Sequence, residues 1–223
     1  MNFEEGAVIL IDKPLEWTSF DVVGKIRNTI RVKKVGHAGT LDPLATGLLI
    51  LCTGKMTKKI DEFQAQEKEY EGELVLGKTT PSFDRETEVD QEFDISSITE
   101  DMIRKNVSSF IGTIQQVPPL YSAIKVNGEA LYKKARKGET VEIKAREVTI
   151  SEFEITEVQL PIVKFRIVCS KGTYIRSLVR DFGVALNNGA YMSALRRTRI
   201  GNFHVDNAEQ LPEFIEKHRK LKV

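Results

Sequence analysis

The chain has 223 residues, 41% of them hydrophobic and 29% charged, with a formal net charge of +1 at pH 7. This composition is typical of a globular protein and excludes a strongly basic chain, so any binding of nucleic acid must depend on local patches. Cys52 and Cys169 are too few for a disulfide framework and lie in apolar runs, so we expect both to be reduced and buried. The sequence shows no signal peptide, membrane span or metal-binding spacing, which predicts a cytoplasmic protein without a metal.

The first part of the chain alternates between apolar runs and polar segments. It predicts a strand at 7–12, a helix at 19–30, a loop at 31–43, a short amphipathic helix at 55–63, a strand at 69–77 and an irregular surface segment at 79–94. Ser19 is the expected cap of the first helix, because apolar residues then follow at helical spacing.

The rest of the chain is richer in strands. It predicts a helix at 98–112, strands within 141–158 and 162–170, a helix at 174–188, a strand at 194–203 and a last helix at 208–220. Between them, 117–138 predicts a strand, a turn at Asn127 and Gly128, and a short basic helix. The pattern favours an α+β fold with a mixed or antiparallel sheet and helices packed on it, as a single domain over 1–223.

The stretch GHAGTLDPLATGLL, at 36–49, holds one carboxylate, Asp42, among glycines. Asp followed by Pro is an ordinary helix start, so Asp42 could be an N-cap. The neighbouring glycines instead favour a shaped loop that a ligand approaches closely, with Asp42 as a catalytic group. His37 on the same loop is either a polar surface group or a contact to substrate, made by stacking or by donating to phosphate.

Other candidates have an equally plain structural interpretation. Tyr174 and Arg176 are at a strand-to-helix junction, where Arg176 is either solvated or paired with a buried carboxylate. Tyr70 is either a half-exposed strand residue or a stacking surface for a base. In KPLEWTSFD, Trp17 is expected to pack the first strand onto the first helix, and Lys13 is a weaker candidate for a ligand contact. The run RRTR, at 196–199, indicates a local positive surface.

Taken together, six segments resemble the TruB-type tRNA pseudouridine synthases, in that family's order and spacing. They are KPLEWTS, GHAGTLDPLATGLL, KEYEGELVLGKTT, VPPLYSAIKVNG with LYKKARKG, SKGTYIRSLVRD and LRRTRIGNF. The resemblance implies a pseudouridine-synthase fold, with a mixed, mainly antiparallel sheet and a central RNA-binding cleft. It also implies isomerisation of uridine 55 in the T-loop of tRNA, with no cofactor.

The resemblance assigns roles to individual residues. Asp42 matches the catalytic aspartate, Arg176 the arginine that pairs with it, and Tyr174 a residue that contacts substrate and could relay a proton. His37, Tyr70 and Leu195 match further substrate contacts. The segment 118–146 resembles an RNA-clamping insertion, where we expect phosphate contacts from Lys133, Lys134, Arg136 and Lys137, with Lys13 as a further RNA-backbone candidate.

Two departures from the family pattern stand out. Glu16 occupies a position that is usually Gly, and a residue other than Gly is strained there if the turn needs a positive φ. The sequence also ends soon after LRRTRIGNF, so we expect no C-terminal PUA-like RNA-binding domain. A monomer is the default expectation.

Two rival functions stay open. One is a non-catalytic RNA-binding module that uses the same cleft. The other is a nucleoside or glycosidic hydrolase, although such enzymes usually need two carboxylates or a metal, and the motifs offer one carboxylate. Even for an isomerase, Asp42 could attack C1′, attack C6, or remove a sugar proton to give a glycal.

Overall fold

The structure is a computed structural model that describes residues 2–122, 124–126, 128–139 and 141–219. The chain forms two compact units, unit 1 at 1–71 with 195–223 and unit 2 at 72–194. The sequence predicts one domain over 1–223; the division into units falls within two strands, β4 (Lys68–Leu76) and β12 (Ala190–Ile200).

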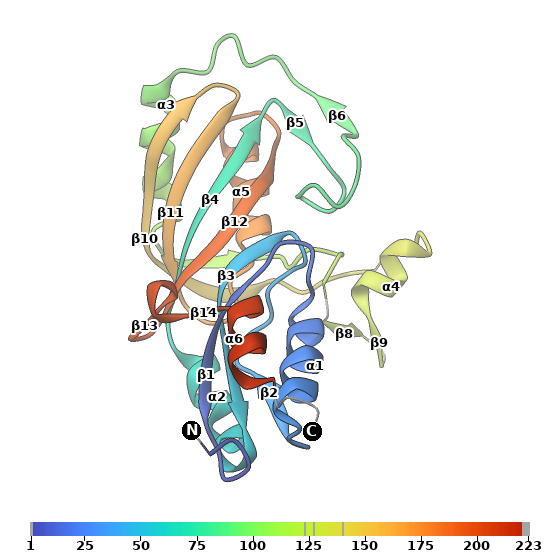
Figure 1. Ribbon diagram of the computed structural model, residues 1–223. Coiled ribbons are helices and arrows are strands. Elements are labelled where there is room, and N and C mark those ends of the chain that lie inside the picture. The colour runs from blue at the N-terminus through green and yellow to red at the C-terminus, as the bar shows by residue number, and fades with distance from the viewer. Residues whose placement is uncertain (1, 123, 127, 140, 220–223) are drawn as a thin grey trace. The chain divides into compact units, whose positions relative to one another are not determined.

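Unit 1 is built on a small mixed sheet (Figure 1). Its other elements are β1 (Val8–Lys13), α1 (Ser19–Ile30), β2 (Val35–His37), β3 (Ala45–Thr53), the 3-10 helix η1 (Gly54–Lys59), α2 (Ile60–Ala65), β13 (Phe203–His204), the 3-10 helix η3 (Val205–Asn207), β14 (Glu209–Gln210) and α6 (Leu211–His218). Strand β3 runs antiparallel to β1 and β2, and β12 runs parallel to β3 with Leu195 opposite Ala45.

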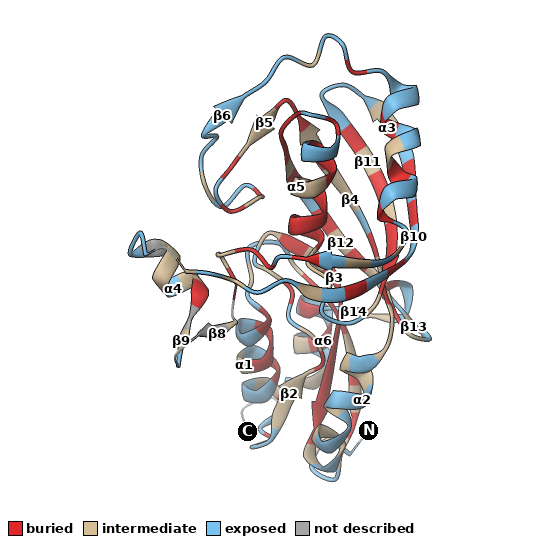
Figure 2. Cartoon of the chain, turned by 180° about the vertical axis from the view of Figure 1, so that it is seen from behind, coloured by how far each residue is buried: buried red, intermediate tan, exposed pale blue. Residues whose placement is uncertain are grey.

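Alternation along β3 explains how this sheet is covered on both faces. Leu49 and Leu51 pack with α1 and α6 in one core, whereas Leu48 and Ile50 pack with α2 in another. A strand buried on both faces has a continuous apolar sequence, and β3 was therefore missed by a search for alternation. Figure 2 shows the resulting contrast on α1, where buried residues lie along one side and exposed residues along the other.

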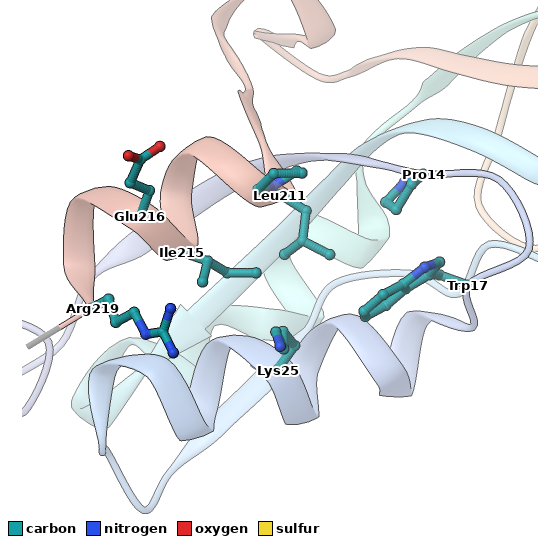
Figure 3. Close-up of a pocket in the computed structure, with 8 residues that line it drawn as sticks. Pro14, Trp17, Lys25, Leu211, Ile215, Glu216 and Arg219 are labelled. Atoms are coloured by element: carbon teal, nitrogen blue, oxygen red, sulfur yellow. The ribbon is translucent and has the colours of Figure 1, made fainter.

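Trp17 packs against the core that β1 and α1 share, as the sequence predicts. Figure 3 shows Trp17 and Lys25 facing Leu211 and Ile215 of α6 across a pocket of about 540 Å³. The pocket is a mainly apolar groove between α1 and α6.

Unit 2 contains an antiparallel arrangement of β7, β10 and β11 with helices beside it. Its elements are β5 (Lys78–Thr79), β6 (Gln91–Glu92), α3 (Glu100–Asn106), the 3-10 helix η2 (Val107–Phe110), β7 (Gly112–Gln116), β8 (Lys125–Val126), β9 (Glu129–Ala130), α4 (Leu131–Arg136), β10 (Arg146–Gln159), β11 (Ile162–Cys169) and α5 (Ile175–Ala185). Phenylalanines from η2, β10, β11 and α5 form its aromatic core, with ring centroids 5.4–6.3 Å apart.

Several predictions at this level are confirmed and others are corrected. The predicted α+β class and both reduced, buried cysteines are confirmed. The cap of α1 is Thr18 rather than Ser19, because Thr18 and Asp21 form a reciprocal capping box. The predicted loop at 31–43 contains strand β2. The predicted turn at Asn127 and Gly128 falls partly outside the described residues. In the described part of the chain, no helix has the length and apolar character needed to cross a membrane.

Candidate active site

Hydrogen bonds fix the Asp42 loop to neighbouring elements of unit 1. The Ser19 hydroxyl at the start of α1 donates to the carbonyl of Leu41 and accepts from its amide, at 3.1 and 2.9 Å. The amide of Ala45 donates to the carbonyl of Asp42 at 3.0 Å, and β3 follows directly. No helix begins at Asp42, so the N-cap interpretation is wrong, and the half-buried carboxylate sits on a shaped loop.

Lys13, at the end of β1, is a buried cation beside this loop. Its side chain is 0% exposed, and its ammonium donates to the carbonyls of Pro14, Trp17 and Pro43 at 2.9, 2.5 and 3.3 Å. Burial lowers the pKa of Lys13 from 10.5 to about 8, and the negative charge of Asp42 opposes that shift. A buried ammonium used in this way contradicts the predicted RNA-backbone contact of Lys13.

Arg197 of β12 is a second buried cation, and sequence reasoning missed its role. It is 1% exposed and donates to the carbonyls of Leu48 and Gly39 at 2.8 and 3.0 Å. Its own backbone lies so close to Gly47 that a Cβ there would be 2.3 Å from the Arg197 carbonyl oxygen. Strand alternation was the available signal, since it turns Arg197 inward between two outward neighbours.

The predicted positive surface at 196–199 is therefore wrong. Arg197 is buried, Arg196 forms a bidentate pair with Asp12 at 2.7 and 3.0 Å, and Arg199 pairs with Glu67 at 3.1 Å. The three arginines of this run help hold the fold of unit 1 together.

His37 ends β2 and is half-buried, on the same stretch of chain as Asp42. Burial and the charge of Arg197 lower the pKa of His37 below its usual 6.5. A hydrogen bond to the Gly39 backbone raises this pKa but does not outweigh the two other effects. The ring is therefore neutral at pH 7 and meets Phe20 edge to face, with centroids 5.3 Å apart. A neutral imidazole favours the stacking alternative over a charged contact to phosphate.

Tyr70 and Leu195 also lie in unit 1. Leu195 is largely buried and lies opposite Ala45 in the sheet. Ala45 follows Asp42 by three positions in the sequence. Tyr70 is 8% exposed, although its polar sequence neighbours predict a half-exposed side chain. The roles of both residues toward substrate remain predictions.

Tyr174 and Arg176 are positioned in unit 2 by the start of α5. Tyr174 is the residue before the helix, and its backbone amide and carbonyl both bond the side chain of buried Gln116, at 2.8 and 3.0 Å. The guanidinium of Arg146 lies over its ring, 4.5 Å from the centroid. Gln116 thus fixes the backbone of Tyr174, and Arg146 contacts its ring.

Arg176, in the first turn of α5, is buried and has a partner that the sequence did not reveal. Its Nε lies 3.5 Å from a carboxylate oxygen of Asp84, and its guanidinium donates to the carbonyls of Ser82 and Tyr121 at 3.1 and 2.8 Å. Asp84 is 3% exposed and accepts from the Ser82 hydroxyl at 2.6 Å. The predicted surface segment 79–94 is thus buried in its first part, at Thr80, Ser82 and Asp84, whereas 85–94 is exposed or half-buried. The pairing of Arg176 with Asp42 remains a prediction.

Two of the three lysines predicted to contact phosphate form ion pairs with glutamates. Lys134 pairs with Glu139 at 3.3 Å and Lys137 with Glu129 at 2.8 Å, whereas Lys133 is exposed. The side chain of Arg136 lies outside the described part of the structure. Among the described residues, no group of three or more His, Cys, Asp or Glu side chains could hold a metal ion.

Comparison with known proteins places this site in a family. The model of the TruB family pseudouridylate synthase N-terminal domain matches residues 27–175, and that of the tRNA pseudouridylate synthase B C-terminal domain matches residues 176–220. The protein named tRNA pseudouridine synthase B from Flavobacterium johnsoniae is 55% identical, over 96% of this chain and 97% of its own. The protein of the same name from Phocaeicola vulgatus is 53% identical, over 97% and 96%.

Solved structures give the same fold. A chain in a crystal structure of a Cbf5-Nop10-Gar1 complex is 32% identical with a TM-score of 0.76, over 97% of this chain and 55% of that one. A chain in the structure of an H/ACA RNP bound to a substrate RNA containing 2′-deoxyuridine is 29% identical with a TM-score of 0.72, over 96% and 53%. This chain therefore spans about half the length of those solved chains.

The fold and the matches define a pseudouridine synthase. The chain belongs to the TruB family of pseudouridylate synthases.

Proposed function

We propose that the chain converts uridine 55 in the T-loop of tRNA to pseudouridine, with Asp42 as the catalytic carboxylate. The relatives named tRNA pseudouridine synthase B support tRNA as the substrate. The observation that carries the catalytic assignment is the loop itself. It presents Asp42 half-buried, ties the residues on both sides of it to α1 and β1, and places the buried Lys13 cation nearby.

The reaction breaks the N1–C1′ bond of uridine, turns the uracil and joins C5 to C1′. The proton on C5 is lost and N1 gains one, so the product is an isomer, and neither an oxidant nor water is consumed. The target base is inaccessible in a folded loop and must flip out, at a cost of a few kcal/mol. Stacking on an aromatic ring offsets part of that cost, a role we assign to Tyr70.

Each site residue then has a defined task. Asp42 reacts as an ionised carboxylate by attack at C1′ or C6, or by removing a sugar proton. Arg176 orients that carboxylate and favours its charged form. Tyr174 accepts or relays the proton lost from C5. His37 fills the space that the base leaves, and Leu195 forms an apolar wall that keeps water from the detached uracil.

We assign RNA backbone contact to the segment 118–146. Its positive charge comes from exposed Lys133 and from Lys134 and Lys137, which each pair with a glutamate. We further propose that the protein acts as a monomer in the cytoplasm and needs no cofactor or metal. The binding module and the hydrolase are the outcomes that the next experiment separates from isomerisation.

The test uses an unmodified tRNA transcript that carries tritium at uracil C5, incubated without added metal. Wild type should release tritium to water, and Asp42→Asn should lower the rate at least about 1,000-fold, since it removes the reacting group. Asp61→Asn, which neutralises an exposed carboxylate on α2, is the matched control and should behave as wild type.

Mapping pseudouridine in the product by chemical modification and reverse transcription identifies the target position. Tight tRNA binding by wild type without tritium release would overturn the isomerase and favour a binding module. Release of free uracil would instead establish a hydrolase.

A further inference from the structure

The outward face of α1 carries an aromatic residue and two arginines in one row. Phe20 is 73% exposed, and Arg27 and Arg31 are also exposed. At helical spacing, positions 20, 24 and 27 lie within about 60° of one another. Arg31 is the C-cap of α1 and directly follows its last turn, with a φ of 55°. Position 24 is Gly, and nothing lies within 4 Å of where its Cβ would be. The row is therefore open to solvent and has a gap in its middle.

The charge of this region is one-sided. Residues 22–41 contain five lysines and arginines and no Asp or Glu. Within the described structure none of these cations forms an ion pair; they are Lys25, Arg27, Arg31, Lys33 and Lys34. Helix α3 behaves differently, since its Arg104 and Lys105 pair with carboxylates one turn away, both at 2.7 Å. The cations of α1 are left available for an anionic partner.

The aromatic end of the row adjoins the catalytic loop. Phe20 contacts the His37 ring edge to face, with centroids 5.3 Å apart and an interplanar angle of 86°. Its neighbour Ser19 exchanges two hydrogen bonds with Leu41, the residue before Asp42. Both contacts lie within unit 1, so α1 and the loop are held as one structure.

We propose that the outward face of α1 is an RNA-binding surface that continues from the catalytic loop. Phe20 stacks on an unpaired nucleotide next to the target uridine, and Arg27 and Arg31 bind phosphates further along the strand. This inference rests on the proposed function, because it takes the RNA that enters at Asp42 as the ligand.

The chemistry of the face fits single-stranded or loop RNA. Unstacked bases bind exposed aromatic rings, and arginines bind the backbone beside them. The helix rises about 15 Å from Phe20 to its last residue, Ile30, which is long enough to follow several phosphates. Because Phe20 is largely exposed, covering it with a base removes its ring from water.

The experiment measures binding of an unmodified T-arm stem-loop RNA by fluorescence anisotropy over a range of salt concentrations, together with tritium release. Phe20→Ala should weaken binding about tenfold with an unchanged salt slope, because stacking is uncharged. It should raise KM far more than it lowers kcat. The double variant Arg27→Gln/Arg31→Gln should reduce the slope of log K against log salt by about 1.5.

Matched controls remove similar side chains elsewhere. Val184→Ala deletes a 63% exposed apolar group on α5, and Lys58→Gln removes an exposed charge on η1. Both should bind as wild type. Phe20→Trp should bind the RNA with wild-type affinity. RNA should quench the tryptophan fluorescence of this variant more than it quenches that of wild type, whose only tryptophan is Trp17.

Two results would overturn the proposal. One is unchanged affinity and salt slope in both the Phe20→Ala and the double arginine variants. The other is a fall in kcat for Phe20→Ala with wild-type affinity, which would make Phe20 only a support for His37. If wild type binds the RNA but releases no tritium, the proposed function fails, while the binding measurements still decide on this surface.

Discussion

The two units stabilise their buried cations in different ways. In unit 1, Lys13 and Arg197 direct their donors to backbone carbonyls around the Asp42 loop. In unit 2, Arg176 has a buried carboxylate partner, Asp84, as well as two carbonyls. Carbonyls satisfy hydrogen bonds without cancelling the charge, whereas a carboxylate does both.

The difference bears on what each unit can do with RNA. The uncancelled charge of Lys13 and Arg197 favours the ionised form of a nearby carboxylate and attracts an anionic substrate. Asp84 offsets part of the charge of Arg176 and helps to hold its guanidinium in one orientation. The following predictions test this distinction, from the largest expected effect to the smallest.

Removing Asp84 should cause the largest loss of stability. Asp84→Ala removes a buried carboxylate that pairs with the guanidinium of Arg176, which costs about 3–5 kcal/mol in the free energy of unfolding. Urea denaturation of the purified protein measures the loss. Glu88→Ala, in the same segment but exposed, is the control and should change stability by less than about 0.5 kcal/mol.

A double variant shows whether the loss comes from the unpaired charge. Adding Arg176→Met to Asp84→Ala should restore part of the stability, because the cation that Asp84 pairs with is then also removed. Strictly additive losses would contradict a coupled pair and point to separate packing defects.

The charge on Lys13 should produce a pH-dependent stability in unit 1. The pKa of Lys13 is about 8 in the folded protein and 10.5 for an ordinary lysine, so the unfolded chain binds more protons between these pH values. Stability from this group therefore rises as the pH increases from 8 to 10.5, and has no slope below pH 8, where both states are protonated. The full gain is about 3 kcal/mol.

The measurement compares the free energy of unfolding of wild type and Lys13→Met across this range. Subtracting the two curves cancels the other titrating groups, and the difference should shift in favour of wild type as the pH rises. Lys13→Met should also loosen the Asp42 loop, because the carbonyls of Pro14, Trp17 and Pro43 lose their donor. Parallel curves would mean that Lys13 keeps an ordinary pKa in the fold.

Much of the fold could be predicted where the apolar pattern has a clear period. The strand β1 and the helix α1 were predicted within one residue of their bounds, and β10 and α5 within a few. The strand β3 was not predicted, because burial on both faces leaves no alternation to detect. Local patterns also cannot show that polar segments such as 79–94 fold around a distant arginine.

The site shows the same limit. Asp42 could be singled out because one carboxylate among glycines is unusual over a short stretch of sequence. Asp84 could not, because its importance arises from Arg176, which is 92 positions away in the chain. The sequence makes Lys13 only a weak candidate for a ligand contact, and the tertiary structure alone shows that its ammonium is enclosed by carbonyls.

The smallest predicted effect concerns Glu16, in the turn that Lys13 anchors. Glu16 has a φ of 66°, and its amide donates to the carbonyl of Pro43 at 2.8 Å. The turn thus keeps a left-handed conformation at a position where the related family usually has Gly. A residue with a Cβ is strained there by about 1–2 kcal/mol. Replacing it by Gly removes this strain, but the larger conformational entropy that Gly loses on folding cancels part of the gain in stability.

Glu16→Gly should therefore stabilise the protein by up to about 1 kcal/mol, a rise in Tm of about 2–4 °C for a chain of this size. Tritium release should stay at the wild-type rate, because the loop keeps its shape. Glu16→Ala retains the Cβ and its strain, so it should bring no such gain. Equal stabilisation by Ala and Gly would show that the glutamate side chain, rather than the backbone conformation, is what destabilises this turn.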